Sequence, residues 1–367
     1  MQIYYDAKRY FYNKTGLGNY SRWLCHNYHE NYPQQELTLL KPGNYASAYS
    51  NLIPSSAQFK TKTYPNFLSW NRSVALENQT TENAVLHGLS NELPIQKIRK
   101  NLTRIVTIHD VIFKYRPQDY RPIDRLTYDL KTKFAIERAD FIIAISETTK
   151  RDLIQTYHAP IDKIVVIYQN MQEEFSQGYT QQDKDDVRRK FILPDNFFVC
   201  VSSFNQRKNQ QSILHAYSKI PTNQRMPILF IGTGATFESF QALSINMQLQ
   251  KSIYFIPYVN TQELAIIYRM SSALIYPSLY EGFGLPAVEA LHSGIPVIGH
   301  HHTSVQEAAG PGGIFMDTLN VEVFADTLQN MAVQDSLRTE LVKKGKKHIQ
   351  SFDSKNGMSQ LHQLYTK

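Results

Sequence analysis

The chain has 367 residues, of which 42% are hydrophobic and 19% are charged. This balance is typical of a folded globular protein, and the length favours two domains over one. The net charge is +7, and most of the excess lies in residues 1–175. The basic residues are scattered and no nucleic-acid-binding motif accompanies them, so we expect an anionic partner other than nucleic acid.

The cysteines and the apolar runs bear on the compartment. Cys25 and Cys200 each lie in an apolar stretch, which argues against a disulfide-stabilised secreted domain. No signal peptide precedes the first strand-like run, and no apolar stretch reaches the roughly 20 residues of a spanning helix. We therefore expect a cytoplasmic protein. Segments 59–72 and 114–138 mix aromatic and basic residues, so the inner face of the cytoplasmic membrane is a candidate contact, with ordinary packed segments as the alternative.

In chain order, short apolar runs alternate with longer mixed segments, which predicts βαβ units and parallel sheets. In the first half, strands are expected at 2–5, 37–40, 84–87, 104–108, 141–145 and 164–168. Helices are expected at 18–32, 121–138 and 147–157. The last of these follows Ser146, a residue type that favours the N-cap position.

A polar stretch at 177–190 predicts a linker and the first helix of a second domain, after which the alternation restarts. Strands are expected at 197–201, 228–231, 253–255, 273–276 and 296–298, and helices at 210–219, 237–246, 261–271, 286–293, 321–332 and 336–352. The prediction is an α/β protein with a first domain at 1–175, a second at 176–350, and a C-terminal helix within 351–367 that crosses back to the first. Ligands of such folds bind at the carboxyl ends of the strands.

The most informative segment is 276–291, with the sequence YPSLYEGFGLPAVEAL. A predicted buried strand ends there, and a loop containing Gly282 and Gly284 leads into a helix with proline in its first turn. Glycines let the backbone approach a ligand, and the free N–H groups of a helix start attract phosphate. Glu281 and Glu289 would repel that phosphate, so we expect both to bind hydroxyl groups beside it. The alternative is that Glu281 caps the helix and Glu289 is merely exposed.

A second segment, 201–209, follows the first strand of the second domain and carries Arg207 and Lys208. Their charges would neutralise a departing diphosphate, and a solvated basic turn is the alternative. No metal ion is expected. Asp183 and Asp185 belong to the polar linker stretch, and no His/Cys cluster has metal-ligand spacing.

These motifs resemble glycosyltransferase family 4, retaining enzymes of the GT-B fold, in which two Rossmann-like domains face each other across a cleft. Glu281 and Glu289 match the paired glutamates that contact the donor sugar and the ribose. Arg207 and Lys208 match the diphosphate-binding segment, and Gly232 matches a glycine turn after a strand. The resemblance covers nearly the whole chain and is most specific in the C-terminal half.

In the N-terminal half, Gly16 and Gly18 resemble the glycine loop that faces the donor. Segments 86–94 and 107–111 resemble those of a subgroup that contains bacterial mannosyltransferases, which would place His109 beside the donor sugar. On the residues alone, a satisfied histidine at a strand end is the alternative for His109.

The sequence also departs from the family pattern. Ser202 and Ser203 stand where some members carry arginine or threonine, so phosphate contacts there must come from hydroxyl or backbone groups. Asp353 follows Ser351 and Phe352 where members often have an aromatic residue.

The resemblance implies a metal-independent, retaining hexosyltransferase without a cofactor. It would move a sugar, with mannose from GDP-mannose favoured, to a glycan or lipid-linked acceptor in cell-surface polysaccharide or lipopolysaccharide synthesis. The implied catalytic residues are His109, Arg207, Lys208 and Glu281. The implied donor-binding residues are Gly16, Gly18, Ser203, Gly232, Tyr258, Val259, Gly282, Phe283, Gly284, Leu285 and Glu289.

Two other classes of function remain open at this point. A nucleotide-sugar-dependent epimerase or oxidoreductase would need a third glycine at Ser21 after the first strand. A non-catalytic partner subunit that binds sugar nucleotides would not need the paired glutamates or the basic pair.

Overall fold

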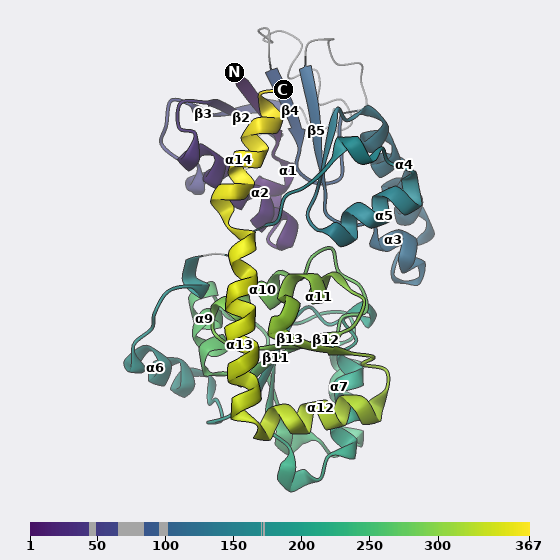
Figure 1. Ribbon diagram of the computed structural model, residues 1–367, viewed down its shortest axis with the longest axis vertical. Helices are drawn as coiled ribbons and strands as arrows, with labels where there is room; N and C mark the ends of the chain where they lie inside the picture. The colour runs from purple at the N-terminus through teal and green to yellow at the C-terminus, as the bar shows by residue number, and fades with distance from the viewer. Residues whose placement is uncertain (44–48, 65–83, 95–101, 170, 172) are drawn as a thin grey trace. The chain divides into compact units, whose positions relative to one another are not determined.

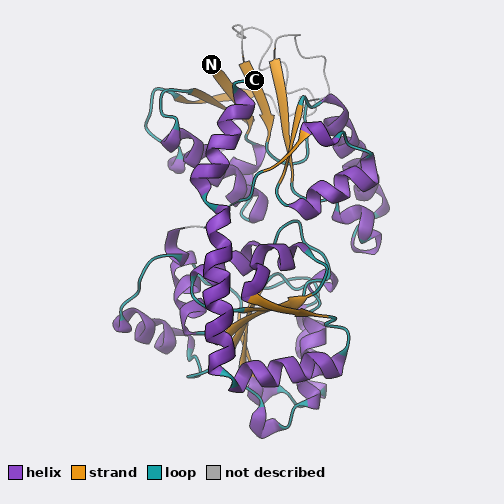
Figure 2. Ribbon diagram, in the orientation of Figure 1, coloured by secondary structure: helices purple, strands orange, loops and turns teal. Residues whose placement is uncertain are grey.

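The computed structural model describes residues 1–43, 49–64, 84–94, 102–169, 171 and 173–367. The chain forms two compact units, Met1–Gln169 with Ser354–Lys367, and Asn170–Asp353. The last helix therefore belongs to the first unit. Among the described residues, each unit contains one fully parallel sheet with its own helices (Figures 1 and 2), so the predicted α/β class is confirmed.

In the described part of the first unit, the sheet has seven strands in the order β3-β2-β1-β4-β5-β6-β7. The strands are β1 (Gln2–Asp6), β2 (Glu36–Pro42), β3 (Phe59–Tyr64), β4 (Ala84–Gly88), β5 (Leu102–Ile108), β6 (Phe141–Ala144) and β7 (Ile164–Val166). The central strand β4 is buried along its whole length, as expected for a parallel sheet that is covered on both faces.

The helices of the first unit cover this sheet. They are α1 (Lys8–Tyr12), α2 (Gly16–Asn31), α3 (Ile112–Tyr115), α4 (Pro122–Arg138), α5 (Glu147–Tyr157) and α14 (Ser354–Tyr365), with 3-10 helices at Ser50–Leu52, Pro117–Asp119 and Ile161–Lys163. The predicted cap of α5 is confirmed, because the Thr149 N–H donates to Ser146 Oγ at 2.9 Å. Helix α14 packs beside α2 (Figure 1).

In the described part of the second unit, the sheet has six strands in the order β10-β9-β8-β11-β12-β13. They are β8 (Phe198–Val201), β9 (Ile228–Ile231), β10 (Ile253–Ile256), β11 (Ala273–Tyr276), β12 (Val297–His300) and β13 (Gly313–Met316). The switch in strand order lies between β8 and β11, where crossovers leave in opposite directions and ligands of open α/β sheets bind.

The second unit contains eight described α-helices. They are α6 (Gln181–Phe191), α7 (Gln210–Lys219), α8 (Phe237–Asn246), α9 (Thr261–Met270), α10 (Leu285–His292), α11 (Ser304–Ala309), α12 (Val321–Val333) and α13 (Asp335–Ile349). Its 3-10 helices are Glu173–Phe175, Gln206–Lys208, Thr222–Gln224, Gln250–Ser252, Gly310–Gly312 and Gln350–Phe352. Side chains of α7, α8 and α12 join those of β8 and β9 in one apolar core.

Each predicted strand and helix overlaps an observed element, but α1, β3, α3, α11 and β13 were not predicted. Strand β3 is an edge strand whose ends, Phe59 and Tyr64, are buried while most of the residues between them are exposed, so it lacks a strand-like apolar alternation. Part of segment 59–72 is therefore strand. Phe67, Leu68, Trp70 and Arg72 lie outside the described residues.

The two glycines of the predicted N-terminal loop lie in the first turn of α2, which begins at Gly16 instead of residue 18. The Asn13 side chain closes this turn by accepting hydrogen bonds from the Thr15 and Gly18 N–H groups. A Cβ atom at Gly18 would lie 1.9 Å from the Asn13 carbonyl oxygen, whereas one at Gly16 would meet nothing within 4 Å. Gly18 is therefore required by close backbone packing.

We predict that Gly18→Ala lowers the free energy of unfolding by about 2 kcal/mol or more, because the backbone of Asn13 must move. Gly16→Ala is the matched control, and it should be neutral or stabilising by about 0.5 kcal/mol because the unfolded chain loses freedom. Urea unfolding followed by circular dichroism measures both. Equal effects of the two substitutions would contradict the packing argument.

Candidate functional site

The charged residues predicted in the second unit meet at the carboxyl end of its sheet. Strands β8 and β11 pair in parallel, so the loops that follow them start at the same edge. Glu281 Oε1 lies 2.8 Å from Arg207 Nη1 and 2.6 Å from Lys208 Nζ. The three side chains are only 17%, 11% and 11% exposed for Arg207, Lys208 and Glu281, so the basic turn is not simply solvated.

The two loops are also joined through their backbones. The Leu279 N–H donates to the Arg207 carbonyl at 3.0 Å, and Arg207 Nη1 donates to the Tyr280 carbonyl at 2.6 Å. Asn209, in the left-handed conformation, ends the basic turn and donates to the Pro277 carbonyl. These bonds hold the cations at one place relative to the glutamate.

The charge balance of this cluster depends on all three groups. Burial by itself would raise the pKa of Glu281, but the positive charges of Lys208 and Arg207 outweigh burial and hold that pKa below its usual value. Burial lowers the pKa of Lys208 while Glu281 opposes the change. Glu281 is therefore ionised at neutral pH, and its carboxylate belongs to the ion-pair cluster.

Glu281 does not cap helix α10. The N-cap residue of α10 is Gly284, with a φ of 114° in the left-handed region, and no side chain caps the helix. The N–H groups of the first turn are thus not used by a side-chain cap. The predicted residues Gly282, Phe283 and Leu285 flank Gly284, and Phe283 is buried against Phe352 with ring centroids 5.4 Å apart.

Glu289 joins the same region through two buried tyrosines. The Tyr268 hydroxyl lies 3.5 Å from Glu289 Oε2. Lys208 Nζ donates to the Tyr276 hydroxyl at 2.9 Å. Burial raises the pKa of Tyr276, and the charges of both Glu281 and Glu289 raise it further. Burial also raises the pKa of Glu289 to about 7, although the Tyr268 hydrogen bond opposes this change.

The remaining predicted residues of the second unit lie in neighbouring loops at the same edge. A Cβ atom at Gly232 would lie 2.3 Å from the Ser202 carbonyl, so the loops after β9 and β8 are in backbone contact. Ser203 is exposed, and its hydroxyl accepts a hydrogen bond from Asn205. Tyr258 and Val259 follow the edge strand β10, and Tyr258 is 78% exposed.

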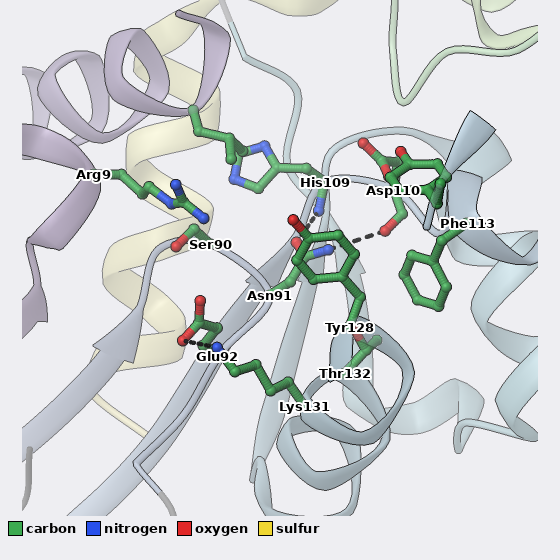
Figure 3. Close-up of a pocket in the computed structure, with 12 residues that line it drawn as sticks. Arg9, Ser90, Asn91, Glu92, His109, Asp110, Phe113, Tyr128, Lys131 and Thr132 are labelled. Carbon is green, nitrogen blue, oxygen red and sulfur yellow. Dashed lines mark hydrogen bonds and ion pairs between the residues drawn. The ribbon is translucent and has the colours of Figure 1, made fainter. Parts of the chain in front are cut away.

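In the first unit, His109 follows β5 and lines a pocket of about 200 Å³ (Figure 3). Its Nε2 lies 2.9 Å from the Leu89 carbonyl, and its ring is 6% exposed. Burial lowers the pKa of His109 to about 4, with Leu89 opposing and the charge of Arg9 adding to the effect. His109 is thus a satisfied neutral histidine in which Nε2–H donates and Nδ1 is the acceptor. Leu17 lines the same pocket, so the Gly16–Gly18 turn is its neighbour.

Apart from His109, the lining residues of this pocket were not predicted as site residues, although most lie in the segments 86–94, 107–111 and 114–138 that the sequence singled out. Glu92 and Lys131 form an ion pair at 3.4 Å, and Asn91 accepts from the His109 N–H and donates to the Asp110 carbonyl (Figure 3). The other lining residues are Arg9, Leu17, Ser90, Phe113, Tyr120, Tyr128 and Thr132. They come from five separate segments, and no local motif connects them.

A buried polar chain lies behind His109. The Tyr20 ring packs edge-on against His109 with centroids 4.6 Å apart, and its hydroxyl lies 3.1 Å from Thr107 Oγ1. His87 lies 2.8 Å from Thr107 through Nε2 and 2.6 Å from the Tyr365 hydroxyl of α14 through Nδ1. Burial lowers the pKa of His87 to about 3, so it is neutral. One assignment satisfies the chain, in which Tyr20 donates to Thr107, Thr107 to His87 and His87 to Tyr365.

Comparison with known proteins follows this division of the chain. Residues 83–169 match the family model Glycosyltransferase Family 4, and residues 181–348 match Glycosyl transferases group 1. The two matches identify a glycosyltransferase, and the two parallel α/β units have the GT-B fold. Within that class, the chain belongs to glycosyltransferase family 4.

Several relatives and solved structures are similar to the chain. O-antigen chain mannosyltransferase B of Escherichia coli is 25% identical, and the alignment covers 77% of this chain and 74% of the relative. The serotype-specific mannosyltransferase WbdA of Escherichia coli is 28% identical over 56% of this chain but only 26% of its own length.

The fold is shared with solved structures of low sequence identity. Sucrose-phosphate synthase of Thermosynechococcus elongatus has a TM-score of 0.77 at 20% identity, covering 100% of this chain and 98% of that one. Anabaena HepE in complex with UDP and glucose has a TM-score of 0.76 at 14% identity, covering 100% and 99%. Separately, no helix among the described residues has both the length and the apolar character needed to cross a bilayer.

We predict that Glu289→Gln changes the pH dependence of stability. In the folded protein the Glu289 carboxyl keeps its proton up to about pH 7, whereas in the unfolded chain it ionises from about pH 4.5. The wild type therefore loses stability as the pH rises from about 4.5 to 7. The glutamine variant lacks this loss, so it should gain about 2 kcal/mol over the wild type between pH 4 and pH 8. Urea unfolding at both pH values measures the gain, and the exposed Glu238→Gln is the control. A gain that is independent of pH would refute the argument.

Proposed function

We propose that the chain transfers mannose from GDP-mannose, with retention of the anomeric configuration, to a glycan or lipid-linked acceptor in cell-surface polysaccharide or lipopolysaccharide synthesis. The observation that carries this proposal is the cluster of Arg207, Lys208 and Glu281 beside the start of α10. Relatives named as O-antigen mannosyltransferases support the sugar, and the HepE complex with UDP and glucose supports a nucleoside-diphosphate donor.

The cluster suits a substrate that brings negative charge. The donor diphosphate would replace Glu281 as the ion-pair partner of Arg207 and Lys208. It would also accept hydrogen bonds from the N–H groups in the first turn of α10. Glu281, released from the cations, would hold a hydroxyl of the transferred sugar, and Glu289 would hold the ribose. The exposed ring of Tyr258 offers a stacking surface for the base, and Val259 offers backbone groups.

The same residues would stabilise the transfer step. The bond between the anomeric carbon and the diphosphate oxygen breaks, and negative charge grows on the leaving group beside the two cations. The acceptor hydroxyl attacks from the same face, and its proton passes to the departing phosphate. This front-face route needs neither a metal nor a protein nucleophile. A neutral His109 would accept a hydrogen bond through Nδ1 from a hydroxyl of the donor sugar.

The oxidoreductase alternative has less support. A dinucleotide-binding turn would need a glycine where Ser21 stands, but Ser21 is buried inside α2 and its hydroxyl donates to the Leu17 carbonyl. A non-catalytic partner subunit is the other alternative function, and measurements of turnover distinguish it from a transferase.

We place the acceptor in the pocket that contains His109. At roughly 30 Å³ per water, its volume of about 200 Å³ corresponds to about seven waters, which suits one sugar ring. Its lining pairs fixed polar groups, Asn91, Glu92 and Lys131, with the aromatic rings of Phe113 and Tyr128 (Figure 3). Sugars offer hydroxyls to such polar groups and C–H faces to such rings.

Helix α4 supports a lipid-linked acceptor. Lys131 and Thr132 line the pocket, while Ile123, Leu126 and Leu130 lie on another face and are 72%, 57% and 60% exposed. Arg121, Arg125 and Lys133 are exposed on or beside the same helix. An apolar stripe with flanking cations is typical of a helix that lies on an anionic membrane surface. We propose that α4 contacts the inner face of the cytoplasmic membrane.

We predict that Arg207→Ala and Glu281→Gln each lower turnover about 100-fold or more, because the first removes a cation that stabilises the leaving group and the second removes the charged acceptor that holds a hydroxyl of the transferred sugar. Release of GDP from GDP-mannose, with and without acceptor glycan, is the measurement, and thermal unfolding checks the fold. Arg189→Ala, at a side chain 72% exposed on α6, is the matched control. Full activity in both variants would reject the site, and donor binding without GDP release would favour the partner subunit.

We also predict that the double variant Ile123→Ser/Leu130→Ser binds anionic vesicles at least about threefold more weakly, because it removes most of the apolar stripe. Sedimentation with anionic and neutral vesicles at two salt concentrations measures this binding. Val333→Ser, at a side chain 76% exposed in the other unit, is the control. Wild-type binding that is absent or insensitive to salt would rule out the membrane contact.

A further inference from the structure

A cluster of two histidines and one aspartate lies at the carboxyl end of the second sheet. Each of His300, His301 and Asp317 offers one potential ligand atom, and these three atoms lie within 4.8 Å of one another. None of the three residues belongs to the motifs that resemble the family. We propose that these side chains form a binding site for a divalent transition-metal ion, of which zinc is the type that suits the donor set.

The sheet brings these residues together. Strands β12 and β13 pair in parallel with His300 opposite Met316, so His301 and Asp317 each come next after a paired position. The His301 N–H donates to the Met316 carbonyl at 2.9 Å, which fixes the two strand ends to each other. The cluster therefore rests on the ends of two paired strands. Sequence spacing could not reveal it, because Asp317 follows the neighbouring strand β13, 16 residues after His301.

The chemistry of the three groups fits a borderline metal. Two imidazoles and a carboxylate suit Zn²⁺, Co²⁺ or Ni²⁺ and not Mg²⁺, which prefers oxygen ligands and its own waters. His300 Nδ1 lies 2.9 Å from Thr318 Oγ1. His300 Nδ1 also accepts a hydrogen bond from the Thr318 N–H at 3.2 Å and lies 3.9 Å from Asp317 Oδ1. A metal ion bound to Nδ1 would replace these hydrogen bonds, whereas binding through Nε2 would require the ring to change tautomer so that Nδ1–H donates to the Thr318 hydroxyl.

Small movements would complete the site. Ligand atoms around a tetrahedral zinc lie roughly 3.3 Å apart, so the cluster must close by somewhat more than an ångström. His300 is 15% exposed and held by Thr318, whereas Asp317 is 49% exposed and its Oδ1 accepts a hydrogen bond from the Leu319 N–H at 3.0 Å. Three protein ligands would leave one position for water or another ligand. Thr318 also accepts from Asn209, the residue after Lys208, so the site adjoins the basic turn.

His302 provides an internal control. It directly follows His301, but its backbone is in the left-handed region with a φ of 56°, its N–H donates to Gln306, and it is not part of the cluster. Metal binding at the proposed site should depend on His301 and Asp317 and not on His302. Weak metal binding to a run of exposed histidines should depend on His302 as well.

The test uses the full chain without an affinity tag, titrated with Co²⁺ and followed by visible absorption, with Zn²⁺ and excess Mg²⁺ as competitors. We expect one Co²⁺ per chain, displaced by Zn²⁺ and not by Mg²⁺. His301→Ala should weaken binding about tenfold or more, as should Asp317→Asn, which keeps an acceptor for the Leu319 N–H. His302→Ala should bind like the wild type.

Thermal unfolding without metal confirms that the variants are folded. No stoichiometric binding by the wild type would overturn the proposal, as would equal weakening by His302→Ala. The inference does not depend on the transferase proposal, because the readout is metal binding and not turnover.

Discussion

The second unit is organised around one carboxylate that two buried cations share. Taking Arg207, Lys208 and Glu281 out of water is costly, and the cost is offset only because both cations reach the same Glu281 oxygen. The loops after β8 and β11, their backbone hydrogen bonds and the glycine at the start of α10 all serve to hold this arrangement. A diphosphate that displaced Glu281 would find both cations already positioned, so little reorganisation would accompany its binding.

Local patterns were enough to predict much of the fold. Strand β9, strand β11 and helices α5, α7 and α8 have the predicted ends, since short apolar runs of parallel strands and the apolar periodicity of helices are encoded within a few residues. Two edge strands, β3 and β13, were missed, whereas the edge strands β7 and β10 were predicted. Strand β3 has buried residues only at its ends, and the short β13 begins with glycine and is fully buried only at Met316.

The candidate site divides in the same way. Arg207, Lys208 and Glu281 were found because each stands in a short motif at a strand end. Glu92 and Lys131 were not, because they come from a loop and a helix far apart in sequence and meet only in the folded first unit. Pairing of this kind is a tertiary property, as is the closeness of Asp317 to His300. The pKa of Glu289 likewise depends on burial, which its position in the motif does not specify.

The polar chain from Tyr365 to Tyr20 has a consequence for biosynthesis. The first unit is discontinuous, and its buried His87 is bonded through Nδ1 to Tyr365 of α14, which follows the whole second unit in the chain. A ribosome therefore releases the second unit, with a contiguous core, before the first can be completed. Until then α2 lacks its contact with α14, and His87 Nδ1 lacks the Tyr365 hydroxyl. The first unit is therefore complete only after the last helix has been synthesised.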